Sequence, residues 1–161
     1  MRVRPRPVNQ TTEAADMPVT AEPLRRFRTA DGVALAYRLW RGDRQQPLLV
    51  LIHGMASNHT RWWEFVAHTA LKDSWDILRL DLRGHGGSAW RGRLTMERWC
   101  DDLAGLLDQE GYARAVVAGH CLGANLGLFF AHRYPEKTTG LVLIEPMLPE
   151  ALVGNLRRVR Q

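Results

Sequence analysis

The residues best suited to chemistry in this 161-residue chain form the segment Gly119-His120-Cys121-Leu122-Gly123. Its Gly-x-Cys-x-Gly spacing is that of a nucleophile elbow, with Cys where Ser is usual. A tight strand-to-helix turn forces the central side chain into a strained backbone conformation, and the two glycines leave room for it. The turn also aims the reactive atom at a helix N-terminus, whose free N–H groups stabilise a thiolate or an oxyanion. The segment therefore predicts Cys121 as a nucleophile.

The sequence around the elbow predicts the elements that must position it. An apolar run from Ala115 to the elbow is typical of a buried strand, and helical spacing of apolar residues follows as far as Phe130. The expected strands are 24–29, 33–40, 48–52, 75–80, the run from Ala115, and 139–144. The expected helices are 60–71, 95–109, the helix after the elbow, and 148–159. Thr60 and Thr95 are the expected N-caps of the first two helices. This alternation predicts an α/β fold with a mostly parallel sheet and helices on both faces.

Composition and charge exclude several classes of function. Six Arg against three acidic residues lie in 1–28, and three Arg with no acid lie in 152–161, so the net charge of +5 comes from the ends. The nearly neutral body predicts no nucleic-acid surface. No apolar run reaches membrane-spanning length, so we expect no membrane contact. We recognise no secretory signal at the start, and the two cysteines suggest reduced thiols, so we expect a cytoplasmic protein. The His and Cys residues lack metal-ligand spacing, and we expect neither a metal nor a cofactor.

The order of three motifs resembles the α/β-hydrolase fold. LIHGM follows the third expected strand, DLRGHGGS the fourth, and GHCLG the fifth. The resemblance implies that 24–149 is the N-terminal core of such a domain with about six of its eight strands, and that 150–161 starts a lid helix or tail. Residues 1–23, rich in Pro and Arg, are expected to be a disordered extension. The resemblance further implies an oxyanion hole built from the backbone N–H groups of Met55 and Leu122.

The chain departs from the family pattern in two ways. Cys replaces Ser at the elbow, as in dienelactone hydrolases and polyhydroxyalkanoate synthases. The chain also ends before the loop that carries the family's catalytic His, so it resembles a C-terminally truncated member. Of the histidines present, His53 and His85 are interpreted as loop-organising residues, and His120 is expected to turn its side chain away from the thiol. No residue is therefore assigned as the general base.

The acidic member of a triad is expected at Glu145. This residue lies about two dozen positions after Cys121, at the end of the sixth expected strand. In haloalkane dehalogenases and their relatives the acid occupies this place, where it orients a catalytic His. The alternative is a structural acid, with Pro146 starting the lid.

Three functions remain open from the sequence. The first is hydrolysis of an ester, lactone or thioester of a small molecule through Cys121, weak or absent in this piece of the domain. The second is acyl transfer by the same thiol, including polyester synthesis, and the third is a non-catalytic binding protein that keeps the fold. Self-association through the exposed sheet edge is also expected. Among the remaining residues, Cys100 is interpreted as an inert apolar filler, and Asp81 and Arg83 as a structural pair.

Overall fold

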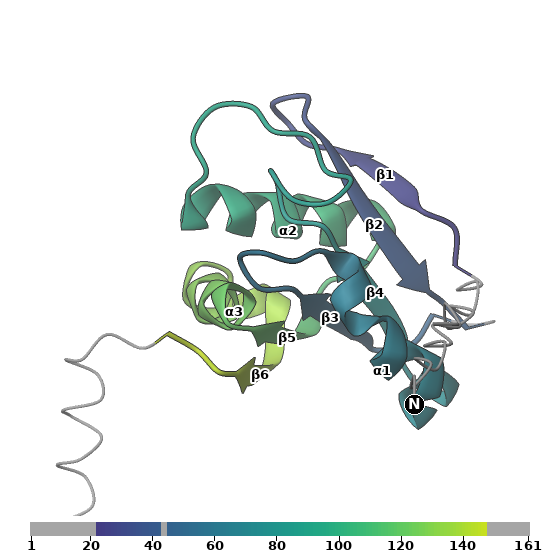
Figure 1. The fold of residues 1–161 in the computed structure, drawn as a ribbon. Helices are drawn as coiled ribbons and strands as arrows, with labels where there is room; N and C mark the ends of the chain where they lie inside the picture. The colour runs from purple at the N-terminus through teal and green to yellow at the C-terminus, as the bar shows by residue number, and fades with distance from the viewer. Residues whose placement is uncertain (1–21, 43–44, 148–161) are drawn as a thin grey trace, which may run out of the picture.

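A computed structural model describes residues 22–42 and 45–147, which build one six-stranded sheet (Figure 1). The strands are β1 Arg25–Arg28, β2 Ala34–Trp40, β3 Leu48–Ile52, β4 Asp76–Leu80, β5 Ala115–His120 and β6 Thr138–Ile144, in the spatial order β1-β2-β4-β3-β5-β6. β1 and β2 form an antiparallel hairpin, and β2 runs antiparallel to β4. β4, β3, β5 and β6 are mutually parallel. The predicted mostly parallel α/β sheet is confirmed.

β3 is buried on both faces because its five residues are all apolar and other elements pack on each side of this strand. Leu48, Val50 and Ile52 point into one core cluster, and Leu49 and Leu51 into another. This alternation follows from the two-residue period of a strand. The loops after β3 and β5 leave the sheet at the same edge, because Ile52 is paired with Gly119 in the parallel register.

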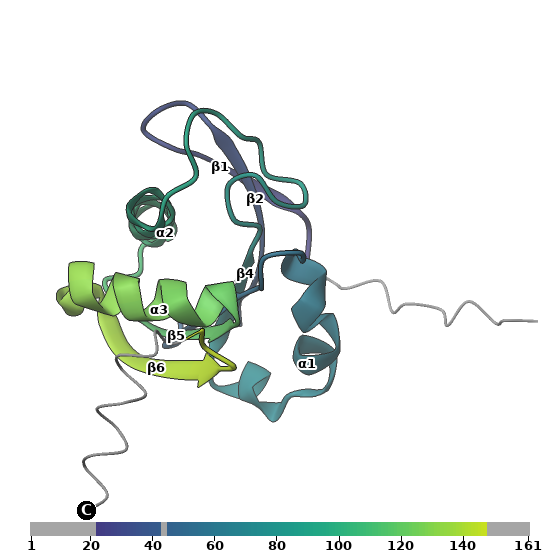
Figure 2. The ribbon, with the colours of Figure 1, turned by 60° about the vertical axis from the view of Figure 1, so that its left-hand side comes forward.

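Helices lie on both sides of the sheet. α2 Met96–Glu110 and α3 Leu122–Arg133 contribute to the larger cluster, whereas α1 Trp63–His68 contributes Val66 to the smaller one. Figures 1 and 2 show α1 on the side opposite α2 and α3. Within residues 22–42 and 45–147, no helix is both long and apolar enough to cross a membrane.

The helix predicted over 60–71 is instead three short pieces. They are the 3-10 helices η1 His59–Trp62 and η2 Ala70–Asp73, with α1 between them; a further 3-10 helix, η3 Pro135–Lys137, precedes β6. The N-cap of η1 is Asn58, not Thr60, because the Asn58 side chain accepts a hydrogen bond from the Thr60 N–H at 2.8 Å. The Thr69 hydroxyl likewise accepts from the Leu71 N–H and starts η2. Short polar side chains compete with helical hydrogen bonds in this way and interrupt a helix.

The folded body begins earlier than the composition indicated. Glu22, placed by the sequence in the disordered extension, is buried, and its carboxylate pairs with the buried guanidinium of Arg79 on β4. A buried Arg is retained only with a counter-charge, which explains why the chain is ordered at this point. Residues 1–21 of the predicted extension and the helix predicted over 148–159 lie outside the described residues.

Candidate active site

Cys121 occupies the turn between β5 and α3, as the elbow motif predicted. Its backbone has φ 53° and ψ −114°, a left-handed conformation that an L-residue with a side chain rarely adopts. Such strain costs about 1–3 kcal/mol and persists where the surrounding structure imposes it. The thiol is partly exposed.

Glycines flank Cys121 because backbone passes close to both of them. A Cβ on Gly119 would lie 2.1 Å from the carbonyl oxygen of Gly123, and a Cβ on Gly123 would lie 2.5 Å from that of Ile52. Any larger residue would separate the start of α3 from the ends of β3 and β5. The spacing of the motif thus has a steric cause in this structure.

His53 organises the loop that follows β3. Its Nε2 accepts a hydrogen bond from the Leu82 N–H at 3.1 Å, so Nδ1 carries the proton and donates to the Gly54 carbonyl oxygen at 2.7 Å. Burial lowers the pKa of His53 and keeps the ring neutral. The loop-organising interpretation of His53 is confirmed.

The loop after β3 lies against the elbow. A Cβ built on Gly54 would be 3.5 Å from the Cβ of Cys121, and Met55, whose side chain is exposed, follows. Leu122 is the first residue of α3, where backbone N–H groups have no intrahelical acceptor. The two N–H groups assigned to an oxyanion hole therefore belong to segments that meet at Cys121.

Glu145 directly follows β6 and its side chain reaches His120. The Glu145 carboxylate Oε2 lies 3.0 Å from His120 Nε2, and the Glu145 backbone has φ 51°. The Cys121 N–H donates to the carbonyl oxygen of Ile144 at 2.9 Å. The sequence prediction placed a carboxylate here but did not identify its partner, His120, which directly precedes Cys121.

A model of the alpha/beta hydrolase fold family matches residues 47–160, more than half of the chain. The chain belongs to the α/β-hydrolase family.

Individual relatives agree with this membership. Lipase LipV of Mycobacterium tuberculosis is 35% identical over 113 residues, which are 70% of this chain and 41% of the lipase. Epoxide hydrolase 3 of Xenopus tropicalis is 34% identical over 113 residues, 68% of this chain and 30% of that enzyme. The crystal structure of a hydrolase from Pseudomonas aeruginosa superposes with a TM-score of 0.72 and 33% identity, covering 87% of this chain and 53% of that one. The chain spans less than half the length of these two curated relatives.

Asn125 on α3 makes a contact beside the candidate site that the sequence interpretation missed. Its side-chain amide donates to the Met147 carbonyl oxygen at 2.8 Å and accepts from the Met147 N–H at 2.9 Å. These two hydrogen bonds hold the segment after β6 against the first turn of α3. A lone amide within the apolar run from Leu122 to Phe130 was the signal available in the sequence.

Asp81 and Arg83 do not pair with each other, and the structural pair predicted for them is wrong. Asp81 accepts from the Gly87 N–H at 2.8 Å and lies 2.8 Å from Nδ1 of His59. Burial alone would raise the pKa of Asp81, but the hydrogen bonds from His59 and Gly87 outweigh it and lower the pKa. Asp81 thus binds the loop after β3 and its own turn, whereas Arg83 binds α2 and the β1–β2 turn.

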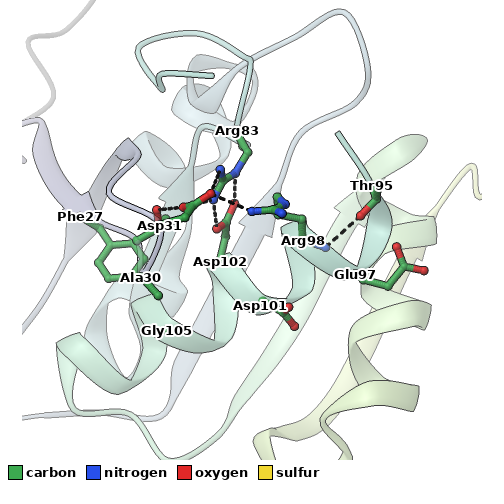
Figure 3. Close-up of a pocket in the computed structure, with 11 residues that line it drawn as sticks. Phe27, Ala30, Asp31, Arg83, Thr95, Glu97, Arg98, Asp101, Asp102 and Gly105 are labelled. Atoms are coloured by element: carbon green, nitrogen blue, oxygen red, sulfur yellow. Dashed lines mark hydrogen bonds and ion pairs between the residues drawn. The ribbon is translucent and has the colours of Figure 1, made fainter. Parts of the chain in front are cut away.

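Arg83 is the centre of an ion network beside a surface hollow of about 350 Å³ (Figure 3). Its guanidinium donates to Asp102 on α2 at 2.6 and 2.8 Å and to Asp31 of the β1–β2 turn at 2.7 and 2.9 Å. The hydrogen bond with Asp102, followed by that with Asp31, raises the pKa of Arg83, and Arg98 also donates to Asp31. With two carboxylates bound, Arg83 joins the hairpin to α2 rather than offering an anion site.

The second thiol has a different environment. Cys100 lies on the buried face of α2, and burial raises its pKa to about 12. The interpretation of Cys100 as an inert apolar filler agrees with this environment.

The sheet face on the α1 side is incompletely covered. A hollow of about 400 Å³ is lined by apolar side chains alone, among them Trp62, Trp75, Val142 and Ile144. Val142 and Ile144 on β6 are 47% and 39% exposed. β6 is also the last strand in the sheet order.

Proposed function

We propose that this chain carries the nucleophilic half of an α/β hydrolase, in which the Cys121 thiolate attacks the carbonyl carbon of an ester, lactone or thioester of a small molecule. The observation that carries the proposal is the left-handed backbone of a partly exposed Cys at the start of α3. Strain of this kind concentrates at functional sites. The names of the relatives, a lipase and an epoxide hydrolase, agree with attack on small electrophilic substrates.

The negative charge that develops on the carbonyl oxygen needs N–H donors. The N–H of Cys121 itself is bound to Ile144, so it is not available. The N–H groups of Leu122 and Met55 are the donors in this proposal, since α3 begins at Leu122 and the loop carrying Met55 lies beside the thiol. Loss of one such donor typically costs about 100- to 1,000-fold in kcat.

The reaction proceeds in two stages. The sulfur of Cys121 forms a bond to the carbonyl carbon, the oxygen takes up the electron pair, and collapse expels the alcohol or thiol to leave an acyl-Cys121. Water then hydrolyses the acyl group and regenerates the thiol. A thiolate suits thioesters and activated esters, whose leaving groups depart readily. Activation of this water needs a base placed above the acyl carbonyl.

The experiment uses p-nitrophenyl acetate with the purified chain. We expect a burst of nitrophenolate, one acetyl group added to the peptide containing Cys121, and a slow steady state. Cys121→Ala should abolish the burst, and Cys100→Ala, the matched control thiol, should retain it. An unacylated Cys121 in the wild-type chain, or an acetyl group on Cys100 instead, would contradict the proposal.

A further inference from the structure

Trp90 is the most exposed of the large apolar side chains that the structure describes. It lies in the loop between β4 and α2 and is 67% exposed. Its indole Nε1–H donates to the carbonyl oxygen of Gly92 at 2.6 Å, so the one polar group of the ring is already bonded within the loop. The ring surface that remains is carbon. Its burial by a partner that offers apolar surface would be favourable.

Four exposed arginines lie close to this tryptophan in the fold. Arg91 and Arg93 belong to the same loop, and Arg26 and Arg28 lie on β1, where their guanidiniums donate to backbone carbonyl oxygens. Among the described residues, no carboxylate forms an ion pair with any of the four. Their positive charge therefore favours an anionic partner.

Hydrogen bonds hold β1, β2 and the loop of Trp90 together. Arg28 is paired with Ala34 on β2, whose carbonyl oxygen accepts from the Ala89 N–H at 2.8 Å, and Trp90 comes next in the chain. Arg26 donates to the same turn, at the carbonyl oxygen of residue 87. Figures 1 and 2 both show the β1–β2 turn beside the loop that joins β4 to α2. The arginine–tryptophan surface consists of Arg26, Arg28, Trp90, Arg91 and Arg93.

Asp31, the acidic residue of the β1–β2 turn, does not cancel this charge. It binds the guanidiniums of Arg83 and Arg98, and Arg83 also binds Asp102. Two carboxylates and two guanidiniums leave that network without net charge. The arginine–tryptophan surface thus keeps a local excess of positive charge, although the chain between its two ends is nearly neutral.

We propose that the arginine–tryptophan surface binds the surface of an anionic lipid bilayer. Its guanidiniums pair with lipid phosphates, and the indole of Trp90 enters the interfacial layer, where tryptophan side chains are enriched. A nucleic acid also offers phosphates, but it has no apolar layer for Leu94, which is 40% exposed in the same loop. The expected lack of membrane contact rested on the absence of a spanning run, and a surface contact needs none.

The surface lies at the same edge of the sheet as Cys121. β4 and β5 both run parallel to β3, so the loops that follow these strands leave the sheet at one edge. Binding to a bilayer would therefore turn that edge toward the lipid. The proposal does not depend on the function proposed above, because binding needs no reaction.

The experiment measures sedimentation of the purified chain with two kinds of vesicle. One contains phosphatidylglycerol and phosphatidylcholine in equal amounts, and the other contains phosphatidylcholine alone. We expect strong binding to the first kind only, weakened by added salt, which screens the charges. Trp90→Ala should lower the partition coefficient by about tenfold, and Arg91→Ala or Arg93→Ala by about fivefold each. Circular dichroism verifies that each variant is folded.

Arg114→Ala is the matched control for the arginine variants. Arg114 is also exposed, but it directly precedes β5 and so lies at the opposite edge of the sheet. Its loss should leave binding unaltered. An equal loss of binding in Arg114→Ala and Arg91→Ala would show that only total charge matters, and would overturn the proposal. Undiminished binding of Trp90→Ala, equal binding to both kinds of vesicle, or no binding of the wild-type chain would overturn it as well.

A labelled single-stranded oligonucleotide tests the other anionic partner. We expect it to bind the chain more weakly than the anionic vesicles do, and Trp90→Ala to leave that binding unaltered. Retention of the oligonucleotide without vesicle binding, lost in Trp90→Ala, would assign the surface to nucleic acid instead of lipid. None of these outcomes bears on acylation of Cys121, which is measured separately.

Discussion

The amide nitrogen of Cys121 lies 2.9 Å from the carbonyl oxygen of Ile144, so a backbone hydrogen bond joins Cys121 to the residue before Glu145. The bond continues the parallel pairing of β5 and β6 by one residue. It positions the two strained residues relative to each other through backbone alone. Side-chain substitutions at either position should therefore leave the arrangement of the two strand ends intact.

The two cysteines should differ strongly in reactivity. Limiting iodoacetamide at neutral pH should label Cys121 first, because its thiol is partly exposed, whereas Cys100 is buried with a pKa raised to about 12. Peptide mapping by mass spectrometry measures the ratio. Preferential labelling of Cys100 would show that the elbow is not formed in solution.

Adding one methyl group at the elbow should be costly. Gly123→Ala would place a Cβ 2.5 Å from the Ile52 carbonyl oxygen and should lower the free energy of unfolding by about 3 kcal/mol. Gly140→Ala on β6 is the matched control, since its nearest neighbour would be a Val116 methyl at 3.6 Å. Urea titration of the two variants measures the difference, and equal stabilities would refute the steric explanation of the motif.

The stability of the chain should fall on acidification because of His53. Burial lowers the pKa of His53 below its ordinary value of 6.5, so the unfolded chain binds a proton more readily. The stabilisation that the neutral His53 ring contributes is complete above about pH 6.5. It is lost as the pH falls from there through the lower pKa of His53 in the folded state, by up to about 1.4 kcal/mol per pH unit. Urea unfolding from about pH 7.5 to 5 tests this. His53→Gln should flatten the slope in that window, and His132→Gln should not.

Removing the Asn125 side chain should release the segment after β6. Asn125→Ala deletes two hydrogen bonds to Met147, each worth about 0.5–1.5 kcal/mol. The Met147 amide should then exchange with solvent faster, as measured by NMR. Asn58→Ala, which removes a cap at η1 instead, should leave that amide protected. Unchanged exchange in Asn125→Ala would mean that the segment is held by other contacts.

Self-association through the uncovered sheet face remains a prediction. Val142 and Ile144 expose apolar surface beside a hollow lined by apolar side chains. Light scattering should give a mass that rises with protein concentration, and Val142→Lys should reduce the rise. A constant monomer mass for the wild-type chain would contradict the prediction.

The sequence predicted correctly those structural elements that a few neighbouring residues determine. The apolar run 48–52 and the Thr95 cap each act over a few residues, and both are found where they were expected. Asn58 and Thr69 were missed because helical periodicity across 60–71 concealed the short polar side chains that interrupt it. The partners of Arg83 were also missed, because Asp31 and Asp102 approach it only through tertiary structure.

In the candidate site, too, features set by neighbouring residues were predictable from the sequence, and features set by tertiary structure were not. Cys121 and its glycines were predictable, since the turn and its steric demands lie within five consecutive residues. The contact between His120 and Glu145 was not, because it depends on the register of β5 with β6 and on a positive φ at Glu145.

The parallel pairing of β3 with β5 has a consequence for folding kinetics. Leu48 pairs with Ala115, so this pairing closes a loop of about 70 residues, and contacts of such long range form slowly. The loop that contains Gly54 and the turn that contains Cys121 become neighbours only when that closure is complete. In a refolding experiment, the enhanced reactivity of Cys121 should therefore appear after most of the helical signal, at the rate of long-range closure.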